Sequence, residues 1–269
     1  MAGDAKITAA TLRARKGTAE RTVFLTAYDV VFARLADEAG VDAVLVGDSM
    51  GMVVQGERST VGVTVDDVVY HSRIVSRGLG RAHLVADMPF MSYQASVEDG
   101  MRAAGRLIKE GHAEAVKLEG GEEVAELTRR LVRAGIPVVG HVGLTPQSIH
   151  QLGGFKVQGR TDAQRAKILA DARAVAEAGA YAVVLEAIPH AVAGEISRAI
   201  PALTIGIGAG ADCDGQVMVM HDLLGLQPSW KPRFVRRYAE LGKAAGEAFA
   251  AYAADVRAGK FPSREETYE

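Results

Sequence analysis

Short apolar runs alternate along the chain with longer, alanine-rich amphipathic stretches. Eight of these runs are nearly continuous in Val, Ile, Leu and Ala, which is typical of parallel strands buried on both faces. They are Val23–Ala27, Ala43–Gly47, His83–Ala86, Ala115–Leu118, Pro137–Gly140, Ala182–Leu185, Leu203–Gly206 and Gln216–Met220.

The segments between these runs have the length and the amphipathic period of helices. Ser96, followed by Glu98 and Asp99, combines an N-cap side chain with acidic residues in a first helical turn. Glycine follows the end of several segments, where a left-handed residue is favoured. The clearest predicted helices are Asp66–Gly78, Ser96–Gly111, Glu122–Ala134, Asp162–Gly179 and His190–Ala199, with a further helix expected at Lys231–Ala254.

Eight apolar runs joined by helix-length crossovers predict a fold of the α/β class, a closed (β/α)8 TIM barrel. The alternative is an open doubly wound sheet. No low-complexity linker divides the 269 residues, so we expect a single (β/α)8-barrel domain over residues 1–269. A content of 48% hydrophobic residues is enough to form one large core.

Overall charge and cysteine content narrow the classes of function. The formal net charge is −2, which gives no electrostatic reason to expect nucleic acid or an anionic membrane as partner. The single cysteine, Cys213, cannot form an intrachain disulfide, and no paired base accompanies it as a catalytic thiol would require. The N-terminal segment lacks the apolar core of a secretory signal, and no apolar run reaches the ~18 residues of a membrane span. We therefore expect a cytoplasmic protein.

Ionisable side chains follow five successive apolar runs. Catalytic groups of a (β/α)8 barrel come from the carboxyl ends of its strands, so these side chains are expected at one rim. Taken singly, each has a structural explanation, as a helix N-cap, an exposed first-turn carboxylate or a hydrogen-bonded histidine. Four carboxylates, a lysine and a histidine together favour a functional site. The residues are Asp48 with Ser49, Asp87, Lys117 with Glu119, His141 and Glu186.

Alternation along one run indicates where two of these charges point. Val116 and Leu118 face one side of the predicted strand, and Lys117 and Glu119 face the other. If the apolar pair faces the helices, the charged pair faces the barrel mouth. Burial of these charges is costly unless a metal, a substrate or a partner compensates it.

The oxygen-rich composition of this rim favours magnesium over zinc, because its candidate residues are mainly carboxylates and include no cysteine. Mg²⁺ takes one or two direct carboxylates and leaves positions for a bidentate ligand. An α-keto acid can chelate through its carboxylate and keto oxygens, and the metal then polarises the carbonyl. A separate carboxylate could remove the adjacent proton, and the lysine could pair with the substrate carboxylate.

Two glycine-rich segments are less specific. Gly206–Gly215 does not fit the spacing of a dinucleotide-binding loop, and we interpret it as tight turns at the rim. The excursion Leu144–Thr161 contains Gly153, Gly154 and Gly159 and is long for a connection in a compact domain. A lid over the site and an oligomer contact are both consistent with it.

Several motifs resemble those of ketopantoate hydroxymethyltransferases, in the family's order, over Ile7 to Tyr252. The motif IGIGAG alone is weak evidence for this resemblance, but the full set of motifs is highly specific to the family. The motifs are LTAYD (Leu25–Asp29), VGDSMGMVVQG (Val46–Gly56), ADMPFMSY (Ala86–Tyr93), VKLEGG (Val116–Gly121), GHVGLTPQS (Gly140–Ser148), GGFKVQGR (Gly153–Arg160), VLEAIP (Val184–Pro189), IGIGAG (Ile205–Gly210) and DGQVMVMHDLLG (Asp214–Gly225).

The resemblance implies a barrel of the phosphoenolpyruvate/pyruvate-binding type and a reaction in pantothenate (coenzyme A precursor) biosynthesis. Hydroxymethyl would pass from 5,10-methylenetetrahydrofolate to 3-methyl-2-oxobutanoate through a magnesium-stabilised enolate, giving 2-dehydropantoate and tetrahydrofolate. The partners would be the keto acid, the folate and further copies of the chain, in a homodecamer. Residue by residue, Asp48, Asp87 and Glu119 match the metal ligands, Glu186 matches the general base, and the substrate contacts match Asp48, Ser49, Asp87, Lys117 and, at the rim, His141.

The sequence departs from the family pattern at one loop. Where the family usually reads Leu-Pro-Val after Ser59-Thr60, this chain has Val61, Gly62 and Val63. Losing a proline and gaining a glycine is expected to loosen the loop without altering a ligand position.

Two rival functions are also consistent with a charged barrel rim. One is a magnesium-dependent carbon–carbon lyase of the isocitrate-lyase type, although the cysteine-bearing KKCGH motif typical of those enzymes is absent here. The other is a non-enzymatic barrel with a binding or scaffold role, which predicts that the rim carboxylates bind no metal.

Overall fold

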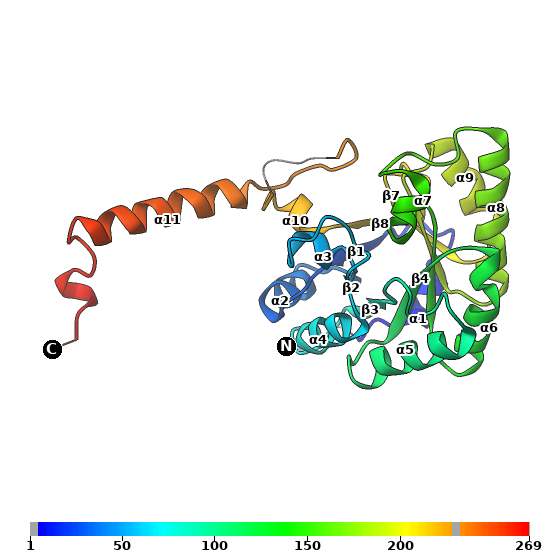
Figure 1. Cartoon of the computed structure of the whole chain (residues 1–269), viewed down its shortest axis with the longest axis horizontal. Helices are drawn as coiled ribbons and strands as arrows, with labels where there is room; N and C mark the ends of the chain where they lie inside the picture. The colour runs from blue at the N-terminus through cyan, green and yellow to red at the C-terminus, as the bar shows by residue number, and fades with distance from the viewer. Residues whose placement is uncertain (1–4, 228–231, 269) are drawn as a thin grey trace. The chain divides into compact units, whose positions relative to one another are not determined.

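A computed structural model describes residues 5–227 and 232–268. Its strands form a closed barrel in which each pairs in parallel with its neighbours in chain order, and the last pairs with the first. Helices surround this barrel (Figure 1). The predicted (β/α)8 barrel is confirmed, and the open sheet is excluded. The strands are β1 (Thr22–Thr26), β2 (Ala43–Val46), β3 (His83–Asp87), β4 (Ala115–Glu119), β5 (Val138–Gly143), β6 (Ala182–Glu186), β7 (Leu203–Ile207) and β8 (Gly215–Met218).

Several crossover helices begin at a side-chain cap. Thr64, Ser96 and Thr161 each accept a hydrogen bond from the backbone N–H three residues further on, as N-cap residues do. The five clearest predicted helices are confirmed, although one begins as a separate 3-10 turn. The elements are α1 (Ala9–Ala14), α2 (Val30–Glu38), α3 (Met50–Val53), α4 (Val65–Ser76), α5 (Val97–Lys109), η1 (Glu122–Val124), α6 (Ala125–Arg133), η2 (Pro146–Ser148), α7 (Ile149–Leu152), α8 (Asp162–Glu177) and α9 (His190–Ala199).

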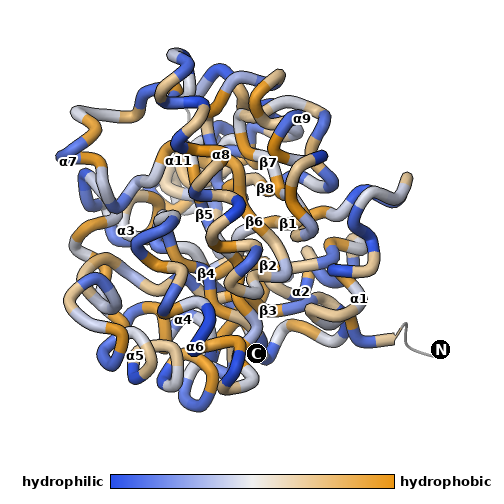
Figure 2. Tube along the Cα trace, turned by 90° about the vertical axis from the view of Figure 1, so that its right-hand side faces the viewer, coloured by the Kyte–Doolittle hydropathy of each residue, from blue (hydrophilic) through white to orange (hydrophobic). Residues whose placement is uncertain are grey.

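Apolar side chains form two clusters, one on each side of the barrel wall. The cluster between strands and helices contains Val116 and Leu118, and the cluster inside the barrel contains Ala115 of the same strand. Figure 2 shows the strands in the middle of the ring of helices, with much of their trace hydrophobic. Because neighbouring residues of a strand face opposite sides, Lys117 and Glu119 point inward with Ala115, as expected.

The chain divides into two compact units, residues 1–219 and 220–269. The barrel lies in the first unit, so the expectation of one domain over the whole chain remains a prediction. The second unit holds α10 (Met220–Leu223), α11 (Leu241–Arg257) and the 3-10 turn η3 (Arg264–Glu266). Along the described ranges, no helix is both long and apolar enough to cross a membrane.

Two predicted boundaries in the C-terminal region are wrong. Met220 begins α10 instead of ending the last strand, and the long helix begins at Leu241 instead of Lys231, which lies outside the described residues. The backbone N–H groups of Tyr238 and Leu241 donate to the carbonyl oxygens of Leu223, the last residue of α10, and Leu224, the residue after it. These tertiary hydrogen bonds replace helical ones, so the amphipathic period extends further than the helix.

Candidate active site

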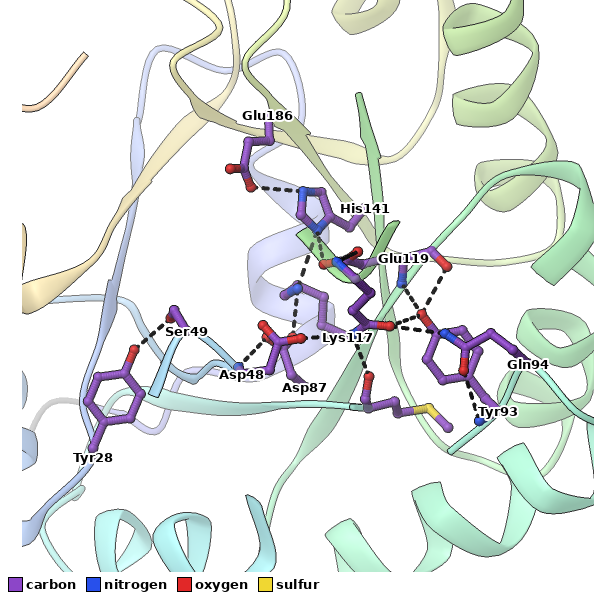
Figure 3. Close-up of polar contacts among 12 residues, drawn as sticks. Tyr28, Asp48, Ser49, Asp87, Tyr93, Gln94, Lys117, Glu119, His141 and Glu186 are labelled. Atoms are coloured by element: carbon purple, nitrogen blue, oxygen red, sulfur yellow. Dashed lines mark hydrogen bonds and ion pairs between the residues drawn. The ribbon is translucent and has the colours of Figure 1, made fainter. Parts of the chain in front are cut away.

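Strand register brings the predicted residues to one end of the barrel. Asp87 at the end of β3 is level with Lys117 on β4, and Glu119 at the end of β4 is level with His141 on β5. Glu186 ends β6. These side chains point toward one another across the barrel mouth (Figure 3). The rim expected from the sequence therefore exists as one cluster.

Lys117 lies at the centre of the cluster although it is a buried cation. Only 5% of its surface is exposed, and its Nζ lies 2.7 Å from Asp87 Oδ1 and 3.4 Å from His141 Nδ1. Burial alone would lower the pKa of Lys117, but the carboxylates of Asp87, Glu119 and Asp48 outweigh burial and raise it. The ammonium therefore stays charged at neutral pH.

His141 lies between two carboxylates. Its Nε2 is 3.1 Å from Glu186 Oε2, and its Nδ1 is 3.4 Å from Glu119 Oε1. Burial and the Lys117 ammonium would lower the pKa of His141, yet interactions with Glu119 and Glu186 raise it to about 9. At neutral pH the ring is therefore an imidazolium, and the carboxylates on its two sides compensate its approach to the Lys117 cation.

Asp48 and Asp87 are buried next to each other. The backbone N–H of Asp48 donates to Asp87 Oδ2 at 2.9 Å. Burial raises the pKa of Asp48 well above its usual range, and the nearby Asp87 and Glu119 carboxylates raise it further. Burial also raises the pKa of Asp87, although Lys117 opposes that effect. Both carboxyl groups therefore hold a proton more readily than an exposed aspartate does.

Ser49 lies at the edge of the cluster. Its Oγ is 2.8 Å from the Tyr28 hydroxyl, a partner that sequence reasoning did not single out (Figure 3). A methyl group at Gly47 would come within 3.1 Å of Ser49 Oγ and 3.3 Å of Asp87 Oδ2. Ser49 and Asp87 thus approach the same stretch of bare backbone after β2.

Gln147 and Tyr93 are buried supports that sequence reasoning also missed. Gln147 Nε2 donates to Asp48 Oδ2 at 2.9 Å, and its backbone N–H donates to Glu119 Oε2 at 3.0 Å. The Tyr93 hydroxyl donates to Gln147 Oε1 at 2.8 Å and accepts from the Glu119 backbone N–H at 3.0 Å. Both residues lie in motifs that carried the family resemblance. Because neither is charged, the residue type alone does not indicate that it supports the rim.

The backbone around Glu186 is held on both sides. Leu144 N–H donates to the Glu186 carbonyl, and Ala187 N–H donates to Ile207, each at 2.9 Å. At Gly143, φ is +98° and a Cβ would lie 2.4 Å from the Glu186 carbonyl oxygen, so only glycine fits. Ala187 has φ of 47°, a left-handed conformation that is costly for a residue with a side chain. The Glu186 side chain is 16% exposed, so the carboxylate is fixed but open to a ligand.

The two glycine-rich segments differ in what they contribute. Gly208 and Gly210 have φ of 64° and 86°, which confirms tight turns after β7. The excursion Leu144–Thr161 contains η2 and α7, and through Gln147 it reaches the rim cluster. Its roles as a lid or an oligomer contact remain predictions.

The donor set of the rim suits a hard cation. Asp48, Asp87 and Glu119 offer carboxylate oxygens, and Glu119 Oε1 is buried with His141 Nδ1, 3.4 Å away, facing it. Among the described residues, no three Asp, Glu, His or Cys side chains already form a ready-made metal site. Asp87 Oδ1 faces Lys117, and Asp48 Oδ2 faces Gln147. The residues therefore fit Mg²⁺ in chemistry, and side-chain rotation would have to bring the three carboxylates together.

Comparisons with known proteins agree over the whole chain. A family model described as ketopantoate hydroxymethyltransferase matches residues 6–264. The 3-methyl-2-oxobutanoate hydroxymethyltransferase of Syntrophotalea carbinolica is 57% identical over 94% of this chain and 95% of its own. The protein of that name from Moorella thermoacetica is 54% identical over 100% of both chains.

Solved structures with low sequence identity share the fold. A 2,3-dimethylmalate lyase, described as a PEP mutase/isocitrate lyase superfamily member, superposes with a TM-score of 0.61 at 19% identity, covering 97% of this chain and 92% of its own. A phosphonopyruvate hydrolase in complex with oxalate and Mg²⁺ gives a TM-score of 0.62 at 13% identity, with 97% and 93% covered.

Barrel and rim together define the class: a TIM-barrel enzyme with the fold of the PEP mutase/isocitrate lyase superfamily. Within that class, the chain belongs to the ketopantoate hydroxymethyltransferase family. The resemblance carried by the sequence motifs is confirmed. The isocitrate-lyase-type alternative shares the fold but not the family, and it is not favoured.

Proposed function

We propose that this chain transfers a hydroxymethyl group from 5,10-methylenetetrahydrofolate to 3-methyl-2-oxobutanoate, giving 2-dehydropantoate and tetrahydrofolate in pantothenate biosynthesis. Family membership supports the reaction. The observation that carries it is the grouping of Lys117, His141 and Glu186 at the barrel mouth. This grouping offers a cation for a carboxylate ligand and a carboxylate to act as base.

We assign substrate binding to the charged side chains at the ends of β3 and β4 and directly after β2. Asp48, Asp87 and Glu119 would hold Mg²⁺, which when bound polarises the keto group and makes the neighbouring carbon more acidic. The phosphonopyruvate hydrolase with the same fold was solved with oxalate, a small dicarboxylate, and Mg²⁺, which is consistent with this assignment. The Lys117 ammonium pairs with the substrate carboxylate, and Ser49 lies at the edge of the same site.

Glu186 acts as the base that removes the proton. Its carboxylate takes the proton from the branched third carbon of the keto acid, and the C–H electrons move toward the keto oxygen. The His141 imidazolium, 3.1 Å away, orients the carboxylate. The third carbon then bonds to the one-carbon unit, both carbon–nitrogen bonds from that unit to the folate break, and water supplies the hydroxyl oxygen. The protons from the third carbon and from water replace those bonds on the folate nitrogens.

We further propose that the enzyme works in the cytoplasm as a homodecamer. Helix α11 supports an oligomer because none of its side chains is buried, and Phe249, Tyr252 and Val256 are 72%, 58% and 45% exposed. Apolar side chains gathered on one exposed helix are typical of an interface. Sedimentation equilibrium of the full chain tests this assembly, and a monomer at micromolar concentration would refute it.

Proton exchange tests the catalytic proposal. We expect purified protein with Mg²⁺ in D₂O to remove the C3 proton signal of 3-methyl-2-oxobutanoate without folate, and EDTA to abolish this exchange. Glu186→Gln should lose exchange, whereas Glu177→Gln, the same change at an exposed position of α8, should keep it. Exchange by Glu186→Gln at the rate of the unmodified enzyme would refute the assignment of the base.

A further inference from the structure

A cavity of about 510 Å³ lies beside the rim cluster. Its walls come from the ends of β4 and β5 and from one face of α8, which contributes Ala163 and Asp171. The cavity and the proposed keto-acid site share Glu119, Tyr93 and Gln147. A ligand in the cavity would therefore reach the reacting centre from the side of Glu119.

The volume of the cavity suits a ligand larger than the keto acid. Small-molecule sites are commonly about 300–1,000 Å³, and a branched keto acid would fill only a fraction of this space. The walls combine apolar side chains with amide groups. Val124, Val142 and Ile168 supply the apolar part, Phe90 adds an aromatic ring that is 36% exposed, and Gln164 adds an amide.

The charge of the walls disfavours an anionic group inside the cavity. Among the described lining residues, three are carboxylates, Glu119, Glu123 and Asp171, and one is a cation, Lys167. That cation already faces Asp171 as well as Glu122 and Glu123. Phosphates and further keto-acid molecules are therefore disfavoured, whereas a flat ring with several N–H donors along one edge is favoured.

Asp171 is placed to receive such an edge. Its side chain is 15% exposed, and its polar contacts with described residues, the Glu122 N–H and the Lys167 ammonium, are made by Oδ1. Oδ2 remains to accept a hydrogen bond. A methyl group at Gly121 would overlap the Asp171 carboxylate, at 1.9 Å from Oδ1, so this side chain has little freedom to turn away.

We propose that this cavity binds the pterin ring of the folate co-substrate. Asp171 accepts hydrogen bonds from the amino edge of the pterin, and the ring faces pack on Phe90 and the apolar wall. Glu119 joins the cavity to His141 and hence to Glu186, so a one-carbon unit on the pterin points toward the carbon from which Glu186 removes the proton. The inference rests on the proposed function, whose reaction supplies the folate.

Filling the cavity tests the inference. Ala163 is exposed and lines the cavity, so Ala163→Trp should occupy part of it without entering the core. We expect the KM for 5,10-methylenetetrahydrofolate to rise about tenfold or more, because the indole takes space that the pterin needs. Asp171→Asn should raise it by about tenfold, through loss of a charged acceptor. Ala166→Trp, at an exposed position of α8 outside the cavity lining, is the matched control and should leave the KM within about twofold.

Proton exchange measured without folate distinguishes failure of this inference from failure of the proposed function. If the unmodified enzyme exchanges the C3 proton but Ala163→Trp keeps the normal KM for the folate, the inference is overturned and the proposed function stands. If Ala163→Trp loses exchange as strongly as transfer, the effect belongs to the keto-acid site and the inference is again overturned. An unmodified enzyme that neither exchanges nor transfers refutes the proposed function, and the inference with it.

Discussion

Replacing Gln147 with methionine should destabilise the protein strongly without changing its charge. Gln147 is 4% exposed, and its side-chain amide donates to Asp48 Oδ2 and to the Met88 carbonyl, each at 2.9 Å. Methionine has a similar length and volume, so the change removes hydrogen bonds and leaves little empty space. Asp48 and Met88 then retain buried acceptors that have lost a donor.

The hydrogen bonds that Gln147 makes determine the expected loss of stability. A hydrogen bond to a charged group contributes about 1.5–3 kcal/mol, and one between neutral groups contributes about 1 kcal/mol. Tyr93 loses Gln147 Oε1 as an acceptor but keeps the Glu119 carbonyl, 3.1 Å from its hydroxyl, so it adds little. The Gln147 backbone N–H still reaches Glu119. We therefore expect the free energy of unfolding to fall by about 2–4 kcal/mol.

Urea denaturation, followed by circular dichroism and extrapolated linearly, measures this loss. Gln216→Met is the matched control, because that glutamine is exposed and its side chain donates to the Gly210 carbonyl at 2.9 Å. The control should lose less than about 1 kcal/mol. An equal loss in the two variants would show that the buried amide contributes no more than an exposed one, and our account of the network would be wrong.

Three further changes test other parts of the fold. Lys117→Met leaves Asp87 buried without its cation, so the free energy of unfolding should fall by about 3–5 kcal/mol, and a loss below about 1 kcal/mol in urea would contradict the ion pair. Burial alone would raise the pKa of Glu114, but hydrogen bonds from His83, the Leu84 N–H and Lys6 lower it to about 2. Its stabilisation is therefore present above the ordinary value of 4.5 and lost as the pH falls toward 2. After allowance for solvent screening, Glu114→Gln should lower the free energy of unfolding by about 1 kcal/mol at pH 7 and by less at pH 4. A loss that does not depend on pH would contradict the lowered pKa of Glu114. Gly62→Ala should raise the free energy of unfolding by about 0.4–1 kcal/mol, because φ at Gly62 lies outside the left-handed region and a methyl group there meets no atom within 4 Å. In thermal unfolding, a lowered Tm would point to hidden strain at this position.

The barrel and most of its rim could be predicted because both depend on local patterns. Continuous apolar runs marked the strands, and the residue at the end of each run marked the rim. Strict alternation along β4 was enough to place Lys117 and Glu119 inside the barrel. These features need only the strand period and the rule that parallel strands end on the same side.

The supports of the rim could not be predicted in the same way. Gln147 reaches Asp48, 99 positions earlier, only because the path of the loop after β5 returns over the barrel mouth. From the sequence alone, Tyr93 looks like an ordinary aromatic residue. In the structure, its hydroxyl lies between Glu119 and Gln147 and bonds to both. The start of α11 was misplaced for a related reason, since backbone contacts between distant residues decided where the helix begins.

The close approach of β5 and β6 behind Glu186 limits how this barrel can change by mutation. Any side chain at Gly143 would collide with the carbonyl of the base, so random mutagenesis should recover no substitution there. Position 187 has the opposite character, because glycine or asparagine adopts its left-handed backbone more easily than the alanine present. A library designed to accept other keto acids should therefore hold residue 143 constant and offer residue 187 only residues that tolerate this conformation.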